Sequence, residues 1–177
     1  MSATTAPPAR TWPSIAASGW RFLPLTAAVI LADQLVKAWI VHHFALFERR
    51  HVLAVLDIIL TYNTGAAFSF LAEASGWQRW VFVLLALSVS GALLVWLRRL
   101  EAARQRLLCG ALALIAGGAL GNMIDRLRFG RVVDFVHVHW QQHFFPAFNV
   151  ADSAITIGAA LLILDAWRDS RAQRGRH

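Results

Sequence analysis

Four long stretches of almost uninterrupted hydrophobic residues divide the chain, at residues 22–41, 80–97, 107–124 and 148–167. Each is close to the ~20 residues that an α-helix needs to cross about 30 Å of hydrocarbon, at about 1.5 Å per residue. The pattern therefore predicts four transmembrane helices and a small multi-pass membrane protein.

Two shorter segments between these stretches have a different pattern. Residues 52–62 and 132–138 are rich in β-branched side chains and too short to cross the membrane as helices. The second segment follows Gly130, which favours a turn. We expect both segments to form short strands packed on the outer face of the membrane.

The hydrophobic pattern predicts a single membrane domain flanked by two short tails. The first tail covers residues 1–21 and the second, which is basic, covers 168–177. The domain itself is expected at residues 22–167, with external connections at about 42–79 and 127–147.

Composition supports the membrane assignment. The 177 residues are 58% hydrophobic and only 15% charged, with a mean hydropathy of +0.52, which nearly excludes a water-soluble globular protein. A net charge of +7 would suit nucleic acid, but the arginines lie in short runs beside the hydrophobic stretches, as they do in cytoplasmic flanks. We therefore expect no nucleic-acid partner. Since Cys109 is the single cysteine, an intramolecular disulfide and a zinc–thiolate site are excluded.

The arginines also predict an orientation. Residues 98–106 contain four of them, and so does the tail after Trp167. Because cytoplasmic segments carry an excess of basic residues, both termini are expected in the cytoplasm and the two strand-containing connections outside. The first hydrophobic stretch contains Asp33 and Lys37 and is followed by no cleavage pattern, so we expect a retained helix instead of a signal peptide.

Ionisable residues inside the hydrophobic stretches are the candidates for function. Each costs at least ~2.5–3.5 kcal/mol to insert, so such residues usually face the interior of a helix bundle. Asp33 and Lys37 are four residues apart and lie on one face of a helix. A structural ion pair and a direct role in the site are both open.

The third helix combines small and polar residues. Gly117, Gly118 and Gly121 thin one face so that a neighbouring backbone can approach, which packing alone explains. Asn122, Asp125 and Arg126 follow at the outer end of this helix, where they are expected to form a polar cap.

Two aspartates are expected to meet at the outer end of the fourth helix. Asn149 and Asp152 lie where that helix begins, and either could serve only as an N-terminal cap. Asp134, however, lies eighteen residues before Asp152, in a strand that must return to the same helix end. Two carboxylates in a low-dielectric site can share one proton and activate water for attack on a carbonyl, without a metal or a covalent intermediate.

Other chemistries have weaker support in the sequence. His137, His139 and His143 could gather around a metal, but their aromatic-rich surroundings favour packing or surface exposure. A serine–lysine hydrolase would require Lys37 beside a serine, and no nucleophile-elbow pattern surrounds the candidate serines.

Five motifs together resemble the bacterial lipoprotein signal peptidases, also called signal peptidase II. They occur in the family's order, from the first helix through the fourth, and cover nearly everything but the tails. The motifs are DQLVK at residues 33–37, NTGAAF at 63–68, GGALGNMIDR at 117–126, VVDF at 132–135 and FNVADS at 148–153.

The resemblance implies an all-α bundle of four transmembrane helices with a small β-rich cradle and a further helix on the periplasmic side. It implies an intramembrane aspartyl endopeptidase of the bacterial inner membrane, active near the periplasmic face. The substrate would be a diacylglyceryl-modified prolipoprotein, cut just before the lipid-modified cysteine.

Matching the motifs residue by residue places the catalytic pair on Asp134 and Asp152. No cofactor or metal is implied, and the expected partners are prolipoproteins and membrane lipid, with the chain acting as a monomer. The supporting residues that orient the pair and hold the substrate would be Asp33, Lys37, Asn63, Gly65, Gly118, Asn122, Asp125, Arg126, Asn149 and Ala151.

Two alternatives of another class stay open. In a small proton-coupled transporter or channel component, Asp33, Asp125, Asp134 and Asp152 would form a relay. In an accessory membrane subunit, the buried ion pairs would only fix the packing of the helices.

Overall fold

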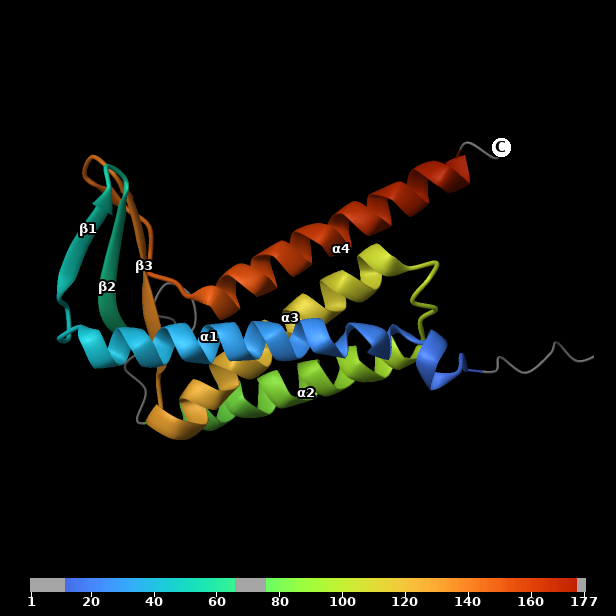
Figure 1. Cartoon of the computed structure of the whole chain (residues 1–177), viewed down its shortest axis with the longest axis horizontal. Coiled ribbons are helices and arrows are strands. Elements are labelled where there is room, and N and C mark those ends of the chain that lie inside the picture. The colour runs from blue at the N-terminus through green and yellow to red at the C-terminus, as the bar shows by residue number, and fades with distance from the viewer. Residues whose placement is uncertain (1–11, 66–75, 175–177) are drawn as a thin grey trace, which may run out of the picture.

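A computed structural model describes residues 12–65 and 76–174 of the chain (Figure 1). Two short 3₁₀ helices, η1 and η2, precede four long α-helices and a four-stranded sheet. Their bounds are η1 Ile15–Ala17, η2 Gly19–Phe22, α1 Leu23–His43, β1 Arg49–Leu53, β2 Leu56–Asn63, α2 Gln78–Arg99, α3 Arg106–Phe129, β3 Val132–Trp140, β4 His143–Phe144 and α4 Val150–Arg174.

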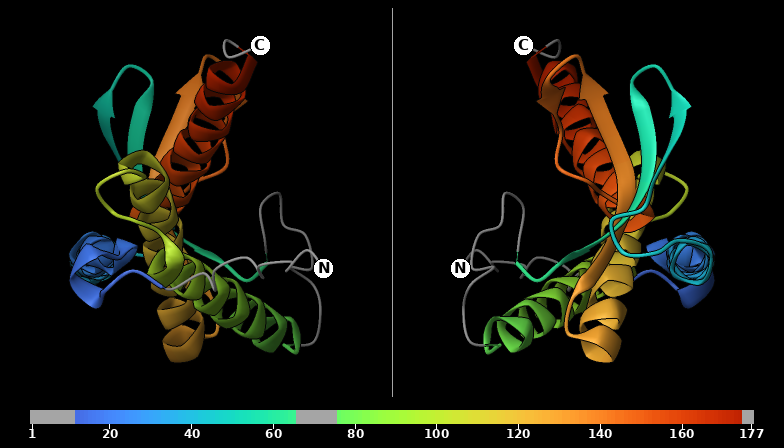
Figure 2. Two further views of the ribbon diagram at one scale, coloured as in Figure 1. Left: turned by 90° about the vertical axis from the view of Figure 1, so that its right-hand side faces the viewer. Right: turned by 90° about the vertical axis from the view of Figure 1, so that its left-hand side faces the viewer.

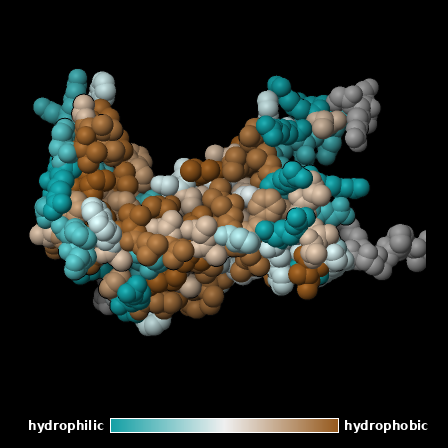
Figure 3. All heavy atoms as spheres, viewed as in Figure 1, coloured by the Kyte–Doolittle hydropathy of each residue, from teal (hydrophilic) through white to brown (hydrophobic). Residues whose placement is uncertain are grey.

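All four α-helices are long and apolar enough to cross a membrane. Hydrophobic side chains cover the middle of the bundle and hydrophilic ones gather at its two ends (Figure 3). Large apolar residues such as Leu31, Leu84 and Ile163 point outward, at 60–71% exposure. Since apolar patches of this extent are rare on soluble monomers, the described chain is a multi-pass membrane protein.

All four helices end later than the hydrophobic pattern predicted, and α3 and α4 extend furthest beyond it. α3 continues to Phe129 because its end is set by Gly130, which adopts the left-handed conformation at φ 74° and donates its N–H to the Arg126 carbonyl at 3.1 Å. α4 continues to Arg174, so most of the predicted basic tail is helical. Its last turns hold arginines, which interact favourably with a helix C-terminus.

α3 is the central helix and packs against the other three. Half of its most apolar window is buried, against 17–22% for α1, α2 and α4. Small residues make this possible: a Cβ at Gly118 would collide with the carbonyl oxygen of Ala151 in α4. The predicted packing role of these glycines is therefore confirmed, and it brings the start of α4 against the C-terminal half of α3.

The sheet stands at one end of the bundle (Figures 1 and 2) and is antiparallel in the order β1-β2-β3-β4. The segment 52–62, predicted as one strand, is instead a hairpin whose strands β1 and β2 pair at Leu53 and Leu56. Its two-residue turn, Ala54–Val55, lacks the Gly, Pro, Asn or Asp that marks most turns, so composition does not reveal it.

A hydrophobic cluster joins the sheet to the end of α1. It contains Ile40 and Phe44 from the end of α1, with Leu60, Val133 and Phe135 from the strands. This contact fixes β3 beside the C-terminal ends of α1 and α3. The described residues between α1 and α2 form strands and no helix, and residues 66–68 of the NTGAAF motif lie outside the described range.

Candidate active site

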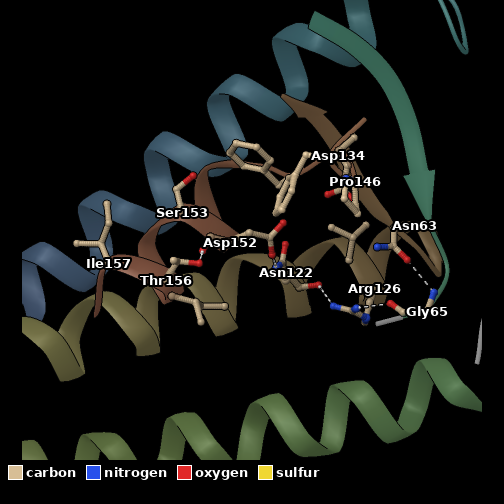
Figure 4. Close-up of a pocket in the computed structure, with 15 residues that line it drawn as sticks. Asn63, Gly65, Asn122, Arg126, Asp134, Pro146, Asp152, Ser153, Thr156 and Ile157 are labelled. Atoms are coloured by element: carbon tan, nitrogen blue, oxygen red, sulfur yellow. Dashed lines mark hydrogen bonds between the residues drawn. The ribbon is translucent and has the colours of Figure 1, made fainter. Parts of the chain in front are cut away.

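The two aspartates at the predicted catalytic positions face one cavity of about 590 Å³ (Figure 4). Asp134 comes from β3, where it pairs with Thr61 of β2, and its side chain is 3% exposed. Asp152 comes from the first turn of α4. The strand return predicted from the sequence thus brings both carboxylates to the same cavity.

Asp152 also caps its own helix. The Asn149 side-chain oxygen accepts from the Asp152 N–H at 2.9 Å, and Asp152 Oδ2 accepts from the Asn149 N–H at 3.2 Å. This reciprocal arrangement is a capping box, so the capping interpretation is correct. It uses one oxygen of Asp152 and leaves the other, Oδ1, to accept from Asn122 Nδ2 at 2.8 Å.

Asp134 has no basic partner at ion-pair distance among the described residues, only amide donors. Its Oδ1 accepts from Asn149 Nδ2 at 2.7 Å, and the Asn63 side chain also hydrogen-bonds to it. Burial, with a further contribution from the charge of Asp152, raises the pKa of Asp134 to about 7. At neutral pH this carboxyl group is therefore partly protonated, which lets the pair hold a single proton.

The predicted ion pair of Asp33 and Lys37 forms and includes a third residue. Lys37 Nζ lies 2.8 Å from Asp33 Oδ2 and 3.0 Å from Asp125 Oδ2, and it donates to Asn122 Oδ1 at 3.0 Å. Lys37 is 3% exposed and both aspartates are 1% exposed or less. All three ammonium protons thus have acceptors, and the two carboxylates share a buried cation.

Asp33 and Asp125 also hold the backbone beside Asp134 and Asp152. Asp33 Oδ1 accepts from the Ala151 N–H at 2.9 Å, and Asp125 Oδ2, which also contacts Lys37, accepts from the Val133 N–H at 3.0 Å. Each bond fixes the residue that precedes Asp152 or Asp134. The ion cluster therefore positions both the strand and the helix that carry these two aspartates.

Gln34 belongs to this cluster and was not singled out in the sequence. Its Nε2 lies 2.9 Å from Asp125 Oδ1 and 3.2 Å from Asp33 Oδ2. A polar residue directly after Asp33 in a hydrophobic stretch was the signal that could have identified it. The sequence reasoning passed over it because an uncharged amide carries a smaller cost in the membrane than an ion.

Asn122 and Asn149 connect the ion cluster to Asp134 and Asp152. Asn122 Oδ1 accepts from Lys37 and also from Asn149 Nδ2 at 3.2 Å, while its amide nitrogen donates to Asp152. Asn149 Nδ2 in turn reaches Asp134. Both asparagines are at most 9% exposed, so this path of hydrogen bonds is shielded from solvent.

The far side of the cavity is formed by the chain that follows β2. Arg126 donates from Nη2 to the Gly65 carbonyl at 3.0 Å, and the Gly65 N–H donates to Asn63 Oδ1 at 3.0 Å. Arg126 also lies 4.8 Å from the centre of the Phe82 ring. The side chains at the predicted supporting positions therefore lie in the hydrogen-bond network or, like Gly118, against it.

Apolar residues complete the cavity, and the sequence reasoning missed most of them. Phe145 and Phe148 pack edge to face at 6.0 Å, and the side of α4 supplies the rest. No spacing in the sequence predicts this apolar lining, because its residues come from separate segments of the chain. The full apolar lining is Val132, Phe145, Pro146, Ala147, Phe148, Ile155 and Ile157.

The histidines considered as metal ligands lie away from this cavity. His137 stacks on Phe144 at 5.5 Å between ring centres, a contact of the kind that the packing interpretation expects. His139 lies beside the same ring at 5.9 Å, and His143 is in β4.

Comparison with known proteins agrees with the motifs. Residues 25–168 match the family described as Signal peptidase (SPase) II. A lipoprotein signal peptidase of Pseudomonas aeruginosa strain UCBPP-PA14 is 49% identical over 160 residues, which are 88% of this chain and 93% of the relative. Its counterpart in Shewanella sp. strain MR-4 is 48% identical over 159 residues, covering 90% and 93%.

The fold is also similar to that of solved proteins. A bacterial membrane enzyme solved by the in meso method at 2.3 Å resolution superposes with a TM-score of 0.75 at 30% identity, covering 85% of this chain and 89% of the other. A second such enzyme, at 1.9 Å resolution, gives 0.72 at 29% identity. With a match that spans most of the sequence, close relatives and a common fold, the chain belongs to the signal peptidase II family.

Proposed function

We propose that this chain is an intramembrane aspartyl endopeptidase that removes the signal peptide from diacylglyceryl-modified prolipoproteins. It would cut just before the lipid-modified cysteine, with Asp134 and Asp152 as the catalytic pair. One observation carries the assignment: these two carboxylates face one cavity with amide partners, whereas Asp33 and Asp125 both contact the Lys37 ammonium.

In this mechanism the pair holds one proton. The ionised carboxylate takes a proton from a water molecule, which attacks the scissile carbonyl carbon, while the protonated carboxyl group donates to the carbonyl oxygen. Collapse of the tetrahedral intermediate breaks the C–N bond, and the amine leaves with a proton from the pair. The raised pKa of Asp134, caused first by burial, supports a shared proton at neutral pH.

The cavity suits a substrate that is itself anchored in the membrane. Its walls are the apolar side of α4 and the aromatic pair Phe145 and Phe148, and polar groups are concentrated around the two aspartates. A signal helix and a diacylglyceryl chain are apolar, and the peptide bond between them is polar. The apolar parts of such a substrate therefore match the apolar walls, and its peptide bond matches the polar region around the two aspartates.

We further place the sheet and the cavity on the periplasmic side of the inner membrane, with both termini in the cytoplasm. Four arginines gather where α2 ends and α3 begins, at Arg98, Arg99, Arg104 and Arg106, and they support this orientation because basic residues stay on the cytoplasmic side. Backbone bonds from Gly19 to Leu100 and from Ala102 to Ala17 hold the start of the bundle against the connection between α2 and α3. We expect the chain to work as a monomer surrounded by membrane lipid.

The relay alternative has no support in these observations. A proton relay requires carboxylates that can change charge, but Asp33 and Asp125 each contact the buried Lys37 ammonium within 3.0 Å. The relatives that match most of the chain are named peptidases.

The test is a gel-shift cleavage assay on the purified chain in detergent or lipid, with a diacylglyceryl-modified prolipoprotein as substrate. We expect Asp134→Asn and Asp152→Asn each to reduce cleavage by a factor of at least about 10⁴, since members of such a unit act together. Both variants should keep the wild-type melting temperature within a few degrees and still bind the substrate.

Asp169→Asn is the matched control, because it makes the same change at an exposed position of α4 and should cleave at the wild-type rate. An unlipidated precursor tests the substrate class, and a chelator tests the metal-free mechanism. If well-folded wild type leaves the lipidated precursor intact, the proposed function is wrong. Cleavage that survives in either Asn variant would remove that aspartate from the pair.

A further inference from the structure

Four residues with metal-binding side chains meet on one face of the sheet, away from the catalytic cavity. His51 of β1 is paired with Asp57 of β2, and Asp57 is paired with His137 of β3. Residues opposite one another in a sheet share a face, and His139, two positions beyond His137, lies on that face too. The proposed peptidase mechanism uses none of them.

Asp57 is the centre of this cluster. Its side chain is only 3% exposed although it lies near the end of a hairpin. Its Oδ1 is 2.7 Å from His51 Nδ1, and its Oδ2 is 3.4 Å from His139 Nε2 and 4.0 Å from His137 Nδ1. The ligand atoms of His51, Asp57 and His139 all lie within 4.8 Å of one another.

Two ring nitrogens of the cluster are buried without a partner. His137 Nδ1 and His139 Nε2 are closed off from solvent and have no hydrogen-bond partner among the described residues, although both face Asp57. Leaving a buried polar atom unsatisfied destabilises the fold, so native proteins seldom keep two such atoms in one place. Nitrogens that converge on a carboxylate with no hydrogen bond of their own fit a bound cation.

We propose that this cluster binds a first-row divalent transition-metal ion such as Zn²⁺, with His51 Nδ1, His139 Nε2 and the Asp57 carboxylate as ligands. Imidazole and carboxylate are the ligands that Zn²⁺ takes, at about 2.0–2.2 Å. Tetrahedral bonds of that length separate the ligand atoms by about 3.3 Å. The 3.4 Å between His139 and Asp57 already meets this separation, and the His51 contact needs to open by a few tenths of an ångström.

The fourth ligand of the ion would be His137 Nδ1 or a water molecule. His137 lies 4.0 Å from Asp57 Oδ2 on the side of His139, where the stacked Phe144 ring limits its movement. A ligand from each of β1, β2 and β3 would then fasten the β1–β2 hairpin to β3. The ion would act as a structural pin for the sheet.

Arg49 is the one basic side chain of the described chain within ion-pair distance of Asp57, besides the histidines, and it competes with a metal. Its Nη1 lies 3.5 Å from Asp57 Oδ2, but the side chain is 47% exposed and can turn toward solvent.

The ion would take no part in peptide cleavage. Asp134 lies three residues before His137 on β3, about 10 Å along the strand, and the alternation of a strand points the two side chains to opposite faces. The cavity that contains Asp134 is lined by none of the four cluster residues.

The experiment is a titration of the untagged, full-length chain in detergent with Zn²⁺, followed by calorimetry, and with Co²⁺, followed by visible absorption. We expect one ion per chain and the intense d–d bands of tetrahedral Co²⁺. His139→Ala and His51→Ala should each weaken binding by at least about 10-fold, the lower range for loss of an outer-shell partner. His143→Ala, an exposed histidine of the same sheet, is the matched control and should bind as wild type does.

Melting temperature and cleavage separate this proposal from the peptidase assignment. Zn²⁺ should raise the wild-type melting temperature and leave that of His139→Ala unchanged, while cleavage persists in chelator at a temperature where the chain stays folded. The proposal is overturned if the wild type binds no ion, or if His143→Ala weakens binding as much as His139→Ala does. A His51→Ala variant that is folded by circular dichroism and binds with wild-type affinity would overturn the ligand set.

Discussion

Two groups of aspartates lie side by side in this protein and have opposite surroundings. Asp33 and Asp125 contact the Lys37 ammonium at 2.8 and 3.0 Å and lie in the packed interior between α1 and α3. Asp134 and Asp152 lie on the cavity and receive hydrogen bonds from Asn149 and Asn122.

This difference in partners indicates different roles for the two groups, one structural and one chemical. Asp33 and Asp125 contact a cation directly and act as acceptors for backbone N–H groups. Amide donors leave Asp134 free to take up a proton near neutral pH, since burial has raised its pKa to about 7. Burial alone therefore does not distinguish the two groups of aspartates, whereas the charge of their partners does.

Removing the Lys37 cation should have the largest effect on the stability of the fold. Lys37→Met keeps the length of the side chain but leaves two buried aspartates without their ion partner, which costs about 3–5 kcal/mol. We expect a large drop in the melting temperature in detergent. A second variant that also carries Asp33→Asn and Asp125→Asn should recover part of the loss, because the uncompensated charges are then gone.

Asp134→Asn is the comparison for this experiment. It removes a carboxylate that has no basic partner at contact distance among the described residues, so it should melt near the wild-type temperature or above it. If Lys37→Met melts like Asp134→Asn, the ion cluster does not stabilise the fold as argued.

Much of this arrangement could be predicted from local sequence. The four helices follow from hydrophobic length, and the Asp33–Lys37 pair follows from its i, i+4 spacing. Asp125 could be placed at the end of α3, but its pairing with Lys37 joins residues 88 positions apart. Spacing rules have no access to such a contact, because packing of α1 against α3 creates it.

The sheet shows a second limit of prediction from local sequence. The hairpin of β1 and β2 was not separated into two strands because its turn has β-branched and small residues where Gly or Asn is usual. Without the hairpin, His51 and Asp57 could not be placed opposite each other. The histidines of β3 were noticed in the sequence, but the carboxylate at the centre of their cluster was not.

The proton on Asp134 should give the two groups different responses to pH. Because the pKa of Asp134 is raised from 3.8 to about 7, the folded chain binds more protons than the unfolded chain between these values. Stability therefore falls as pH rises from about 4 to about 7. A pKa difference of one corresponds to about 1.4 kcal/mol, so the loss from this residue is at most about 4 kcal/mol.

Melting temperatures of wild type and Asp134→Asn across this range isolate that contribution, because all other groups titrate in both. The advantage of the Asn variant should grow with pH and level off above about 7. Cleavage by the wild type should also decline above that pH, as the pair loses its shared proton. A constant difference between the two chains from pH 4 to 8 would contradict the raised pKa.

The smallest predicted effect on stability tests how the ion cluster is joined to Asp152. Asp33 reaches the site through the Ala151 N–H, beside Asp152, and this contact needs α4 to lie close to Gly118. Gly118→Ala would push the Ala151 carbonyl away, at a cost of about 1–3 kcal/mol for overpacking. Gly91→Ala is the matched control, since no described atom lies within 4 Å of the added Cβ in the middle of α2.

Because a displacement of about 1 Å can lower a catalytic rate by about 10²-fold, we expect Gly118→Ala to reduce cleavage far more than its modest loss of stability suggests. Gly91→Ala should cleave normally and melt at the wild-type temperature or slightly above. If Gly118→Ala lowers the melting temperature but cleaves at the wild-type rate, the ion cluster stabilises α4 without positioning Asp152. The two groups of aspartates would then be linked only through the stability of the fold.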